Sequence, residues 1–531
     1  MDYSNREGVG ASGRTTRPRA RVAVLACILL ALAAFFGVRS WTDWRHDTQQ
    51  KQADADYKTF MAAVTQAESL PDPLQRCMHY PDLPGTHWHS DTTRSYCQLR
   101  TRHTLSLADI AALLKQGKAS EVDRTFQAYL DAQLHDPAQP GAFDTAFYNA
   151  GFDNSDAETR KIIDLWKQQS PDSAFALAAS GLQYEDAAHK ARGSGWARDL
   201  ADDQVEGMRQ QLALARKDLD RAVSLLPTVT EVYASMVFVG ALGGDGEYMY
   251  RAAEAGLKVD LANFAIRVQM MNQAQPKWGG LFGGEREQQR EAAALATRNP
   301  LLRMVASMPA VYSANCDCDY SPAEQLRQSL AAANDNVSYG NLNILAGDVY
   351  DQNPRLSVEL YSESLRFHPT DPDILRWRAE QILVLRDAEG SVQSIARIAN
   401  AYPDNNAVAL QLGQIYAKTN HVQEAERTYL AILQRDPDDD DAMAWLGDLY
   451  NHGAHQPEKA EALADKLIGR NPDNPQGYIL RVCNQMDHNL PGSYETIHFF
   501  IDHFGDRPEY KSQVAEMRGY LVKHPEKALQ G

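Results

Sequence analysis

Apolar residues recur at helical spacing through most of the chain. From residue 104 onward, segments such as RTFQAYLDAQL (124–134) and RKIIDLWKQQ (160–169) place an apolar residue every three or four positions. This spacing gathers apolar side chains on one face of a helix, whereas a half-buried strand needs strict alternation, of which the chain has little. The pattern predicts an all-α protein.

The C-terminal half is periodic. Four prolines, spaced by 34, 34 and 35 residues, divide it into units of nearly equal length: Pro369, Pro403, Pro437 and Pro472. A fixed period of this size is typical of stacked helical hairpins, in which each unit buries its apolar face against its neighbours. We therefore predict a helical-hairpin solenoid over residues 322–525.

Two of these units resemble the tetratricopeptide repeat (TPR), whose pattern is L-G-x2-Y, then A-x3-F, then proline. The matching residues in the unit 406–437 are Leu412, Gly413, Tyr416, Ala425, Tyr429 and Pro437. Those in the next unit are Leu446, Gly447, Tyr450, Ala460, Ala464 and Pro472. That second unit has one extra residue in its inter-helix turn. The resemblance implies close helix packing at the glycines and alanines, and a long concave surface lined by the first helix of each hairpin.

The middle of the chain, about residues 125–285, has a second resemblance. ARGSGWAR (191–198), LDRAVSLLP (219–227) and PKWGG (276–280) are similar to motifs of the bacterial family called domain of unknown function 4034. Leu281 departs from the family pattern, which has a small polar residue after the paired glycines. The resemblance implies a helical, TPR-like domain with no assigned chemistry.

An uncharged apolar run at the N-terminus, Val22–Val38, predicts a single transmembrane helix. Five arginines precede the run, and this bias favours an inner-membrane protein with a cytoplasmic N-terminus and a periplasmic body. Two alternatives stay open. Ala31-Leu32-Ala33 has the form of a signal cleavage site, which would release a secreted body. The body could also face the cytoplasm.

These patterns divide the chain into five segments. They are a cytoplasmic disordered tail (1–21), the transmembrane anchor (22–38), a juxtamembrane helix with a loop-rich insert that contains cysteine and histidine (39–103), a helical TPR-like domain (104–314) and the TPR-like repeats (322–525). The insert is predicted from the prolines and aromatic residues that cluster after residue 70.

The distribution of charge excludes one class of partner. The net charge is −17, and because residues 1–45 hold seven arginines against three acidic residues, the rest of the chain carries −21. A body this acidic repels phosphate backbones and anionic headgroups, so we expect no nucleic acid partner.

No enzyme motif is complete in the sequence. The chain lacks H-E-x-x-H, S-x-x-K, the G-x-S-x-G elbow and the Walker loop. The acidic run Asp436–Asp441 fails the EF-hand pattern because Asp441 and Gly447 stand where glycine and glutamate are required. We expect this run to begin a helix, and we expect neither a catalytic site nor a bound metal or cofactor.

The insert holds the strongest candidates for chemistry, which are Cys77, His79, His87, His89 and Cys97. Their spacing fits no standard zinc module, and in an oxidising compartment Cys77 and Cys97 are expected to form a disulfide. The alternative is an envelope enzyme, or a metal or redox protein, that uses this insert or the pair Cys316 and Cys318.

The register of the TPR resemblance places seven candidate partner-contacting residues on first helices: Leu410, Gln414, Lys418, Asp441, Trp445, Asp448 and Asn451. This set lacks the cluster of Lys, Arg and Asn with which the family binds acidic C-terminal tails. Its aspartates and tryptophan predict a neutral-to-basic protein or peptide partner. The sequence thus indicates a membrane-anchored, periplasmic scaffold for protein–protein interaction.

Overall fold

The computed structural model describes residue 48 and residues 51–524, apart from positions 87, 137, 194, 196, 279, 281–282 and 317–318. The predicted tail (1–21) and transmembrane anchor (22–38) lie outside these residues. Within the described range, no helix is both long and apolar enough to cross a membrane. The chain divides into residues 1–62, of which 51–62 are helical, and residues 63–531.

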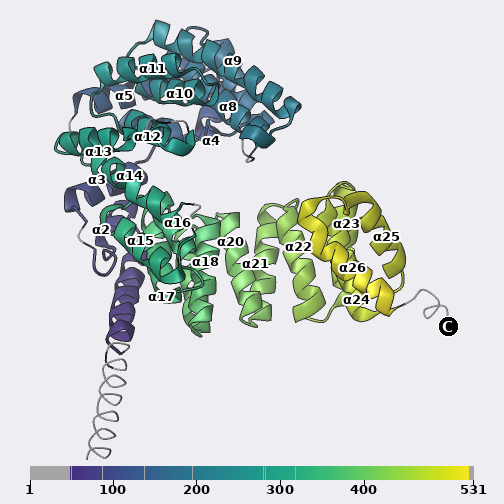
Figure 1. The fold of residues 1–531 in the computed structure, drawn as a ribbon. Helices are drawn as coiled ribbons and strands as arrows, with labels where there is room; N and C mark the ends of the chain where they lie inside the picture. Colours follow the sequence, from purple (N-terminus) through teal and green to yellow (C-terminus); the bar gives the residue numbers. More distant parts are fainter. Residues whose placement is uncertain are drawn as a thin grey trace, which may run out of the picture. The chain divides into compact units, whose positions relative to one another are not determined.

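Every regular element among the described residues is helical, which confirms the predicted all-α class (Figure 1). Residues 51–68 are helical, and the helices between residues 70 and 336 are α2 (Pro73–His79), α3 (Ser90–Thr101), α4 (Leu107–Lys115), α5 (Ala119–His135), α6 (Ala142–Asn149), α7 (Ala157–Gln169), α8 (Ala174–Arg192), α9 (Asp202–Leu225), α10 (Thr230–Leu242), α11 (Gly246–Val259), α12 (Phe264–Gln273), α13 (Gly284–Leu295), α14 (Leu302–Ala314) and α15 (Pro322–Asp335).

Figure 1 shows the remaining helices as successive antiparallel hairpins, coloured green to yellow. They are α16 (Tyr339–Asp348), α17 (Pro354–Phe367), α18 (Pro372–Val384), α19 (Ala388–Ala401), α20 (Asn406–Lys418), α21 (Val422–Arg435), α22 (Asp440–Asp448), α23 (Pro457–Arg470), α24 (Pro475–His488), α25 (Ser493–Phe504) and α26 (Lys511–Lys523). Four short helices are η1 (Ala197–Asp199), η2 (Pro276–Trp278), η3 (Leu449–Gly453) and η4 (Pro508–Tyr510).

The segment that the sequence predicts to be loop-rich contains two helices, α2 and α3. Pro73 stands at the start of α2, where its missing N–H is not needed, and the Asp72 side chain caps the helix by accepting from the Gln75 N–H. A proline that we took as a loop signal is therefore a helix start. The connection between the two helices is also fixed, because the Trp88 indole donates to the Ala333 carbonyl oxygen at 2.8 Å.

A cluster of aromatic rings forms the centre of the core between α4 and α12. The centre of the Phe126 ring lies 5.2 to 6.4 Å from those of five buried aromatic residues, Phe143, Phe147, Phe152, Trp166 and Phe175. All six side chains are buried. Because these rings come from α5 to α8 and one connecting turn, their burial holds four consecutive helices in one domain.

In the C-terminal hairpins, each proline that sets the period lies two residues before a helix cap. The capping residues are Asp371, Asn405, Asp439 and Asn474, and each side chain accepts a hydrogen bond from a backbone N–H in the first turn of its helix. The acidic run Asp436–Asp441 is one of these junctions, since Asp439 caps α22. The repeat is thus a recurring proline-x-Asx start signal for the first helix of each hairpin.

The turn inside each hairpin also repeats. Four non-glycine residues have positive φ at these turns, namely Arg386, Asn420, His455 and Asn489, and they follow one another at intervals of 34, 35 and 34 residues. The interval of 35 falls where α22 continues into η3, a five-residue π-helix. One inserted residue is typically accommodated as such a π-turn, which explains the longer unit.

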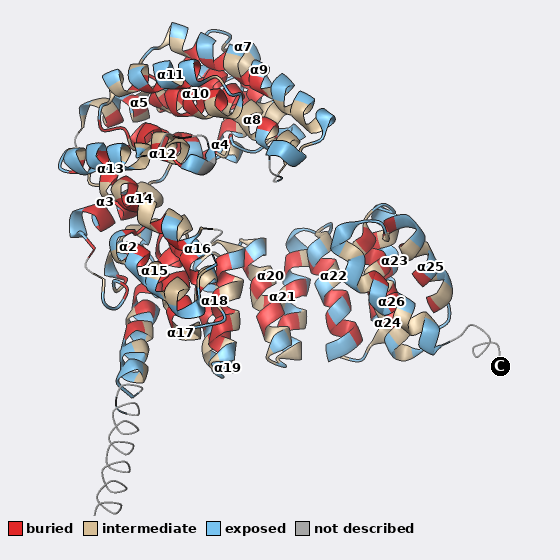
Figure 2. Cartoon of the chain, in the orientation of Figure 1, coloured by how far each residue is buried: buried red, intermediate tan, exposed pale blue. Residues whose placement is uncertain are grey.

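Small residues allow the close helix approaches that the TPR resemblance implies. A Cβ atom added at Gly413 would lie 2.5 Å from the Tyr429 ring, and one at Gly240 would lie 2.8 Å from the Met249 backbone nitrogen. Figure 2 shows buried residues along the faces where such neighbouring helices meet. Glycine is therefore required at both positions by packing rather than by backbone conformation.

Candidate functional site

A cavity of about 720 Å³ lies between α3, α6, α10, α12, α14 and α16. This volume falls within the range of roughly 300–1,000 Å³ that is usual for small-molecule sites. The aromatic residues that line it are Tyr96, Tyr148, Phe238, Phe264, Trp278, Tyr312 and Tyr339. Carboxamides line it as well: Gln269, Asn272, Gln273, Gln275, Asn315 and Asn341.

One wall of the cavity is acidic. Asp144, on α6, is 8% exposed and accepts three hydrogen bonds, from Gln133 at 3.0 Å, Asn263 at 2.7 Å and Thr230 at 2.6 Å. All three donors are neutral, so none supplies a counter-charge. Burial raises the pKa of Asp144 to about 6, although the three hydrogen bonds oppose this rise.

Glu231, in the first turn of α10, is the second carboxylate of this wall. It is half-buried, and it has no hydrogen-bond or ion-pair partner among the described residues. Burial raises its pKa well above the usual range, and the charges of Asp144, Glu185 and Asp153 raise it further. Burial likewise raises the pKa of Glu185 to about 8. These carboxyl groups thus lie where their charged forms are disfavoured unless a cation is bound beside them.

Arg100, on α3, is the one cationic side chain among the described residues that line the cavity. Its guanidinium lies 4.7 Å from the centre of the Tyr339 ring, and its Nε donates to the Phe367 carbonyl oxygen at 3.2 Å. Both contacts hold Arg100 against α16 and α17. The arginine shows no contact with the acidic wall, so among the described side chains none supplies a cation to Asp144 and Glu231.

Sequence motifs do not identify Asp144 and Glu231, yet the sequence contains a signal for each. Asp144 is the only charged residue of α6, and Glu231 is the only charged residue of α10. A lone carboxylate in an otherwise uncharged helix is unusual because burying it is unfavourable. Glu231, Ala234 and Phe238 also share one face of α10 and line the cavity together.

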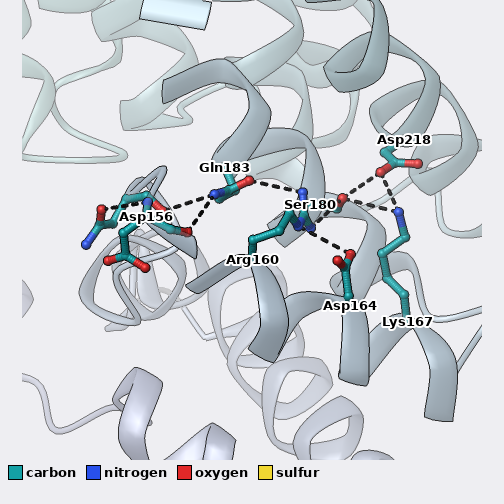
Figure 3. A network of polar contacts seen from close by, with 8 residues as sticks. Asp156, Arg160, Asp164, Lys167, Ser180, Gln183 and Asp218 are labelled. Carbon is teal, nitrogen blue, oxygen red and sulfur yellow. Dashed lines mark hydrogen bonds and ion pairs between the residues drawn. The ribbon is translucent and has the colours of Figure 1, made fainter. Parts of the chain in front are cut away.

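A second polar group of interest is the network between α7, α8 and α9 in Figure 3. The Ser180 hydroxyl donates to Asp218 at 2.6 Å and accepts from Lys167 at 3.2 Å and Arg160 at 2.9 Å. Lys167 and Asp218 also form an ion pair at 2.6 Å. A serine beside a lysine suggests a nucleophile, but Ser180 is fully buried and its hydrogen bonds join three helices. The network therefore has a structural role.

The seven predicted partner-contacting residues do not form one exposed surface. Gln414 and Asn451 are buried, at 7% and 1% exposure, so the prediction that they line an open groove is wrong. Lys418 is exposed but forms an ion pair with Glu380, and Leu410 is partly buried. Three residues on α22 remain accessible, namely Asp441, Trp445 and Asp448.

The cysteines of the insert join α2 to α3. Cys77 and Cys97 form a disulfide, their Cα atoms lie 5.6 Å apart, and both side chains are fully buried. Cys316 also takes part in a disulfide, whereas Cys318 lies outside the described residues. Cys483 has a free thiol. No cluster of His, Cys, Asp and Glu within the described part of the chain has the geometry to hold a metal ion.

The comparison with protein families finds one match. Residues 106–239 match the family described as Domain of unknown function (DUF4034), which confirms the resemblance noted for the middle of the chain. This region supplies Asp144, Tyr148, Glu231 and Phe238 to the cavity. A comparison with curated proteins gives no match.

Several solved structures are similar to this chain. A TPR protein from Parabacteroides merdae is 13% identical, with a TM-score of 0.33, and the match covers 54% of this chain and 98% of that one. Yeast Tom70 is 10% identical, with a TM-score of 0.33, covering 78% and 95%. The Cut9–Hcn1 hetero-tetramer of the APC/C is 12% identical, with a TM-score of 0.27, covering 74% and 82%. Because these scores are low, the TPR-like assignment rests on the repeated hairpins themselves.

Proposed function

We propose that this TPR-like chain with its DUF4034 region is a scaffold that binds a protein or peptide along its C-terminal hairpins. The observation that carries the proposal is the stacking of first helices, since α18 contacts α20, α20 contacts α22, and α22 contacts α24. Stacked hairpins present a continuous surface suited to an extended partner. The motif search finds no complete catalytic motif, and the buried Ser180 is not accessible to a substrate, so neither observation supports an enzyme.

The accessible face of α22 is where the partner is proposed to bind. Trp445 is 40% exposed, and exposed tryptophans often supply much of the energy of an interface. The carboxylates of Asp441 and Asp448 on the same helix give this face a negative charge, and the Asp448 carboxylate lies 2.9 Å from the His452 imidazole. A neutral-to-basic segment therefore fits this face better than an acidic tail.

A peptide array against the purified protein tests the assignment of α22. Wild-type protein is expected to prefer neutral-to-basic peptides and to bind them more weakly at high salt. Trp445→Ala is expected to weaken binding by about 1–2 kcal/mol, roughly tenfold in Kd, because it removes the aromatic contact. Asp448→Lys is expected to shift the preference away from basic peptides.

The matched controls lie on second helices. Leu430→Ala on α21 removes another exposed apolar side chain, and Glu458→Lys on α23 makes the same change of charge as Asp448→Lys. Both controls are expected to leave the binding profile unchanged. A preference for acidic peptides, or equal effects of the α22 variants and their controls, would show that the partner does not bind at α22.

We also propose that residues 22–38 anchor this scaffold in the inner membrane with the body in the periplasm. The arginine bias around the apolar run supports this orientation. Protease added to spheroplasts is expected to digest the body and to spare only the short N-terminal tail. Full protection would place the body in the cytoplasm, and a body released into the medium would indicate cleavage after Ala33.

A further inference from the structure

The cavity bounded by Asp144 and Glu231 has the features of a binding site for an organic cation. We propose that it binds a small free amine with an apolar body, whose ammonium group lies against Glu231 and whose apolar part contacts the aromatic wall. This ligand is separate from the partner proposed for α22, because the cavity is formed by α3 to α16.

The first argument concerns charge. Glu231 has no partner among the described residues, and Asp144 has only neutral donors, from Gln133, Thr230 and Asn263. Two carboxylates that share a partly buried site without a cation destabilise each other. An ammonium group bound between them would stabilise their charged forms by supplying a counter-charge, whereas an anion would destabilise those forms further.

The second argument concerns the rest of the wall. Phe238 lies seven residues after Glu231, two turns along the same face of α10, so an aromatic ring and the carboxylate share one side of the cavity. Phe264, Trp278 and Tyr312 add further rings. Aromatic faces attract ammonium groups and also accept apolar surface, so they suit both ends of an amphipathic amine.

The third argument concerns size and competing groups. At about 720 Å³ the cavity has the volume of a small-molecule site, and its lining combines apolar and aromatic surface with carboxylates and carboxamides. Arg100 does not compete for the carboxylates, because its guanidinium packs on Tyr339 and donates to Phe367. The carboxylates are thus available to a ligand.

Three probes with the same apolar body and different end groups show how the charge of the ligand affects its binding. Calorimetry on the purified full chain would compare 4-phenylbutylammonium with neutral 4-phenylbutanol and anionic 5-phenylpentanoate. We expect the ammonium compound to bind at least about tenfold more tightly than the alcohol, and the anion not to bind. Equal binding of the alcohol, preferred binding of the anion, or no binding of any probe would overturn the proposal.

Two variants then test whether the ammonium group contacts Glu231. Glu231→Gln keeps the shape of the side chain. It is expected to weaken binding of the ammonium compound at least about tenfold and to leave binding of the alcohol unchanged. Glu247→Gln, on the exposed surface of α11, makes the same change of charge and is expected to have no effect. Retained alcohol binding shows that the cavity of Glu231→Gln is intact. Unchanged ammonium binding in that variant would overturn the assignment.

A last arm distinguishes a free amine from a lysine side chain. The dipeptide acetyl-Lys-Phe-amide carries the same butylammonium and phenyl groups on a polypeptide backbone. We expect it to bind more weakly than 4-phenylbutylammonium, because its three amide groups would have to leave water on entering the cavity. Tighter binding of the dipeptide would overturn the assignment to a free amine.

Discussion

Replacing Glu68 by glutamine is expected to lower the free energy of unfolding by about 3–5 kcal/mol, because it leaves a buried arginine without its counter-charge. The Glu68 carboxylate is fully buried and accepts hydrogen bonds from Arg378 at 2.6 Å, Arg397 at 2.9 Å and Tyr80 at 2.7 Å. Arg378 is itself fully buried in α18. Chemical denaturation of the purified protein, followed by circular dichroism, measures the loss.

The control is an exposed pair of the same chemistry. Glu424→Gln on α21 breaks an ion pair with Arg427 and is expected to cost less than about 1 kcal/mol, because water replaces the lost contact. The double variant Glu68→Met, Arg378→Met is expected to recover much of the stability, since apolar side chains of similar size carry no desolvation cost. A loss for Glu68→Gln no larger than for Glu424→Gln would contradict the prediction.

The same carboxylate makes stability depend on pH. Burial opposes the charge of Glu68, but Arg378 and Arg397 together hold its pKa below the usual value of 4.5. A lowered pKa in the folded state means that the contribution is present above about pH 4.5 and is lost as the pH falls further. Wild-type protein is therefore expected to lose stability over this acidic range more steeply than Glu68→Gln.

Local signals in the sequence predict the repeats well because they act within one hairpin. The proline period, the close approach at Gly413 and the extra residue before α23 can be derived from neighbouring residues, and the structure has each of them. The positive-φ turns were missed for a physical reason. None of the four residues there is a glycine, so the strongest sequence signal for positive φ is missing. Asn420, His455 and Asn489 are of types that adopt positive φ more often than most, but Arg386 is not, so the shared turn is not apparent from residue types alone.

Contacts between distant segments cannot be predicted from such local sequence signals. Glu68 and Arg378 are separated by 310 residues, and the cavity takes its lining from six helices between α3 and α16. Periodicity shows which face of a helix is apolar, but it does not show which other helix covers that face. For this reason Asp144 and Glu231 were not predicted to form one wall, although each stands out within its own helix.

Removing the disulfide between α2 and α3 is the second change expected to have a large effect. The bond closes a loop with a sequence separation of 20 residues, and the entropy model assigns about 3 kcal/mol to a loop of this size. The variant Cys77→Ala, Cys97→Ala is therefore expected to lose about that much free energy of unfolding. Cys483→Ala, which removes a free thiol, is the control and is expected to change stability by less than about 1 kcal/mol.

The packing around the disulfide explains why its removal is expected to destabilise helices outside the insert. Cys77 lies next to α17, because its carbonyl oxygen accepts from the Arg366 Nε at 2.7 Å, and the Tyr96 ring lies 4.5 Å from that of Phe367. Loosening α2 and α3 would thus expose one side of the first repeats. Denaturation with and without reductant measures the effect, and mass spectrometry of unreduced peptides from cells should contain the linked pair. Disulfides persist in oxidising compartments, so two free thiols in protein taken from the periplasm would contradict the pairing of Cys77 with Cys97. Equal stability with and without reductant would contradict a structural role for the bond.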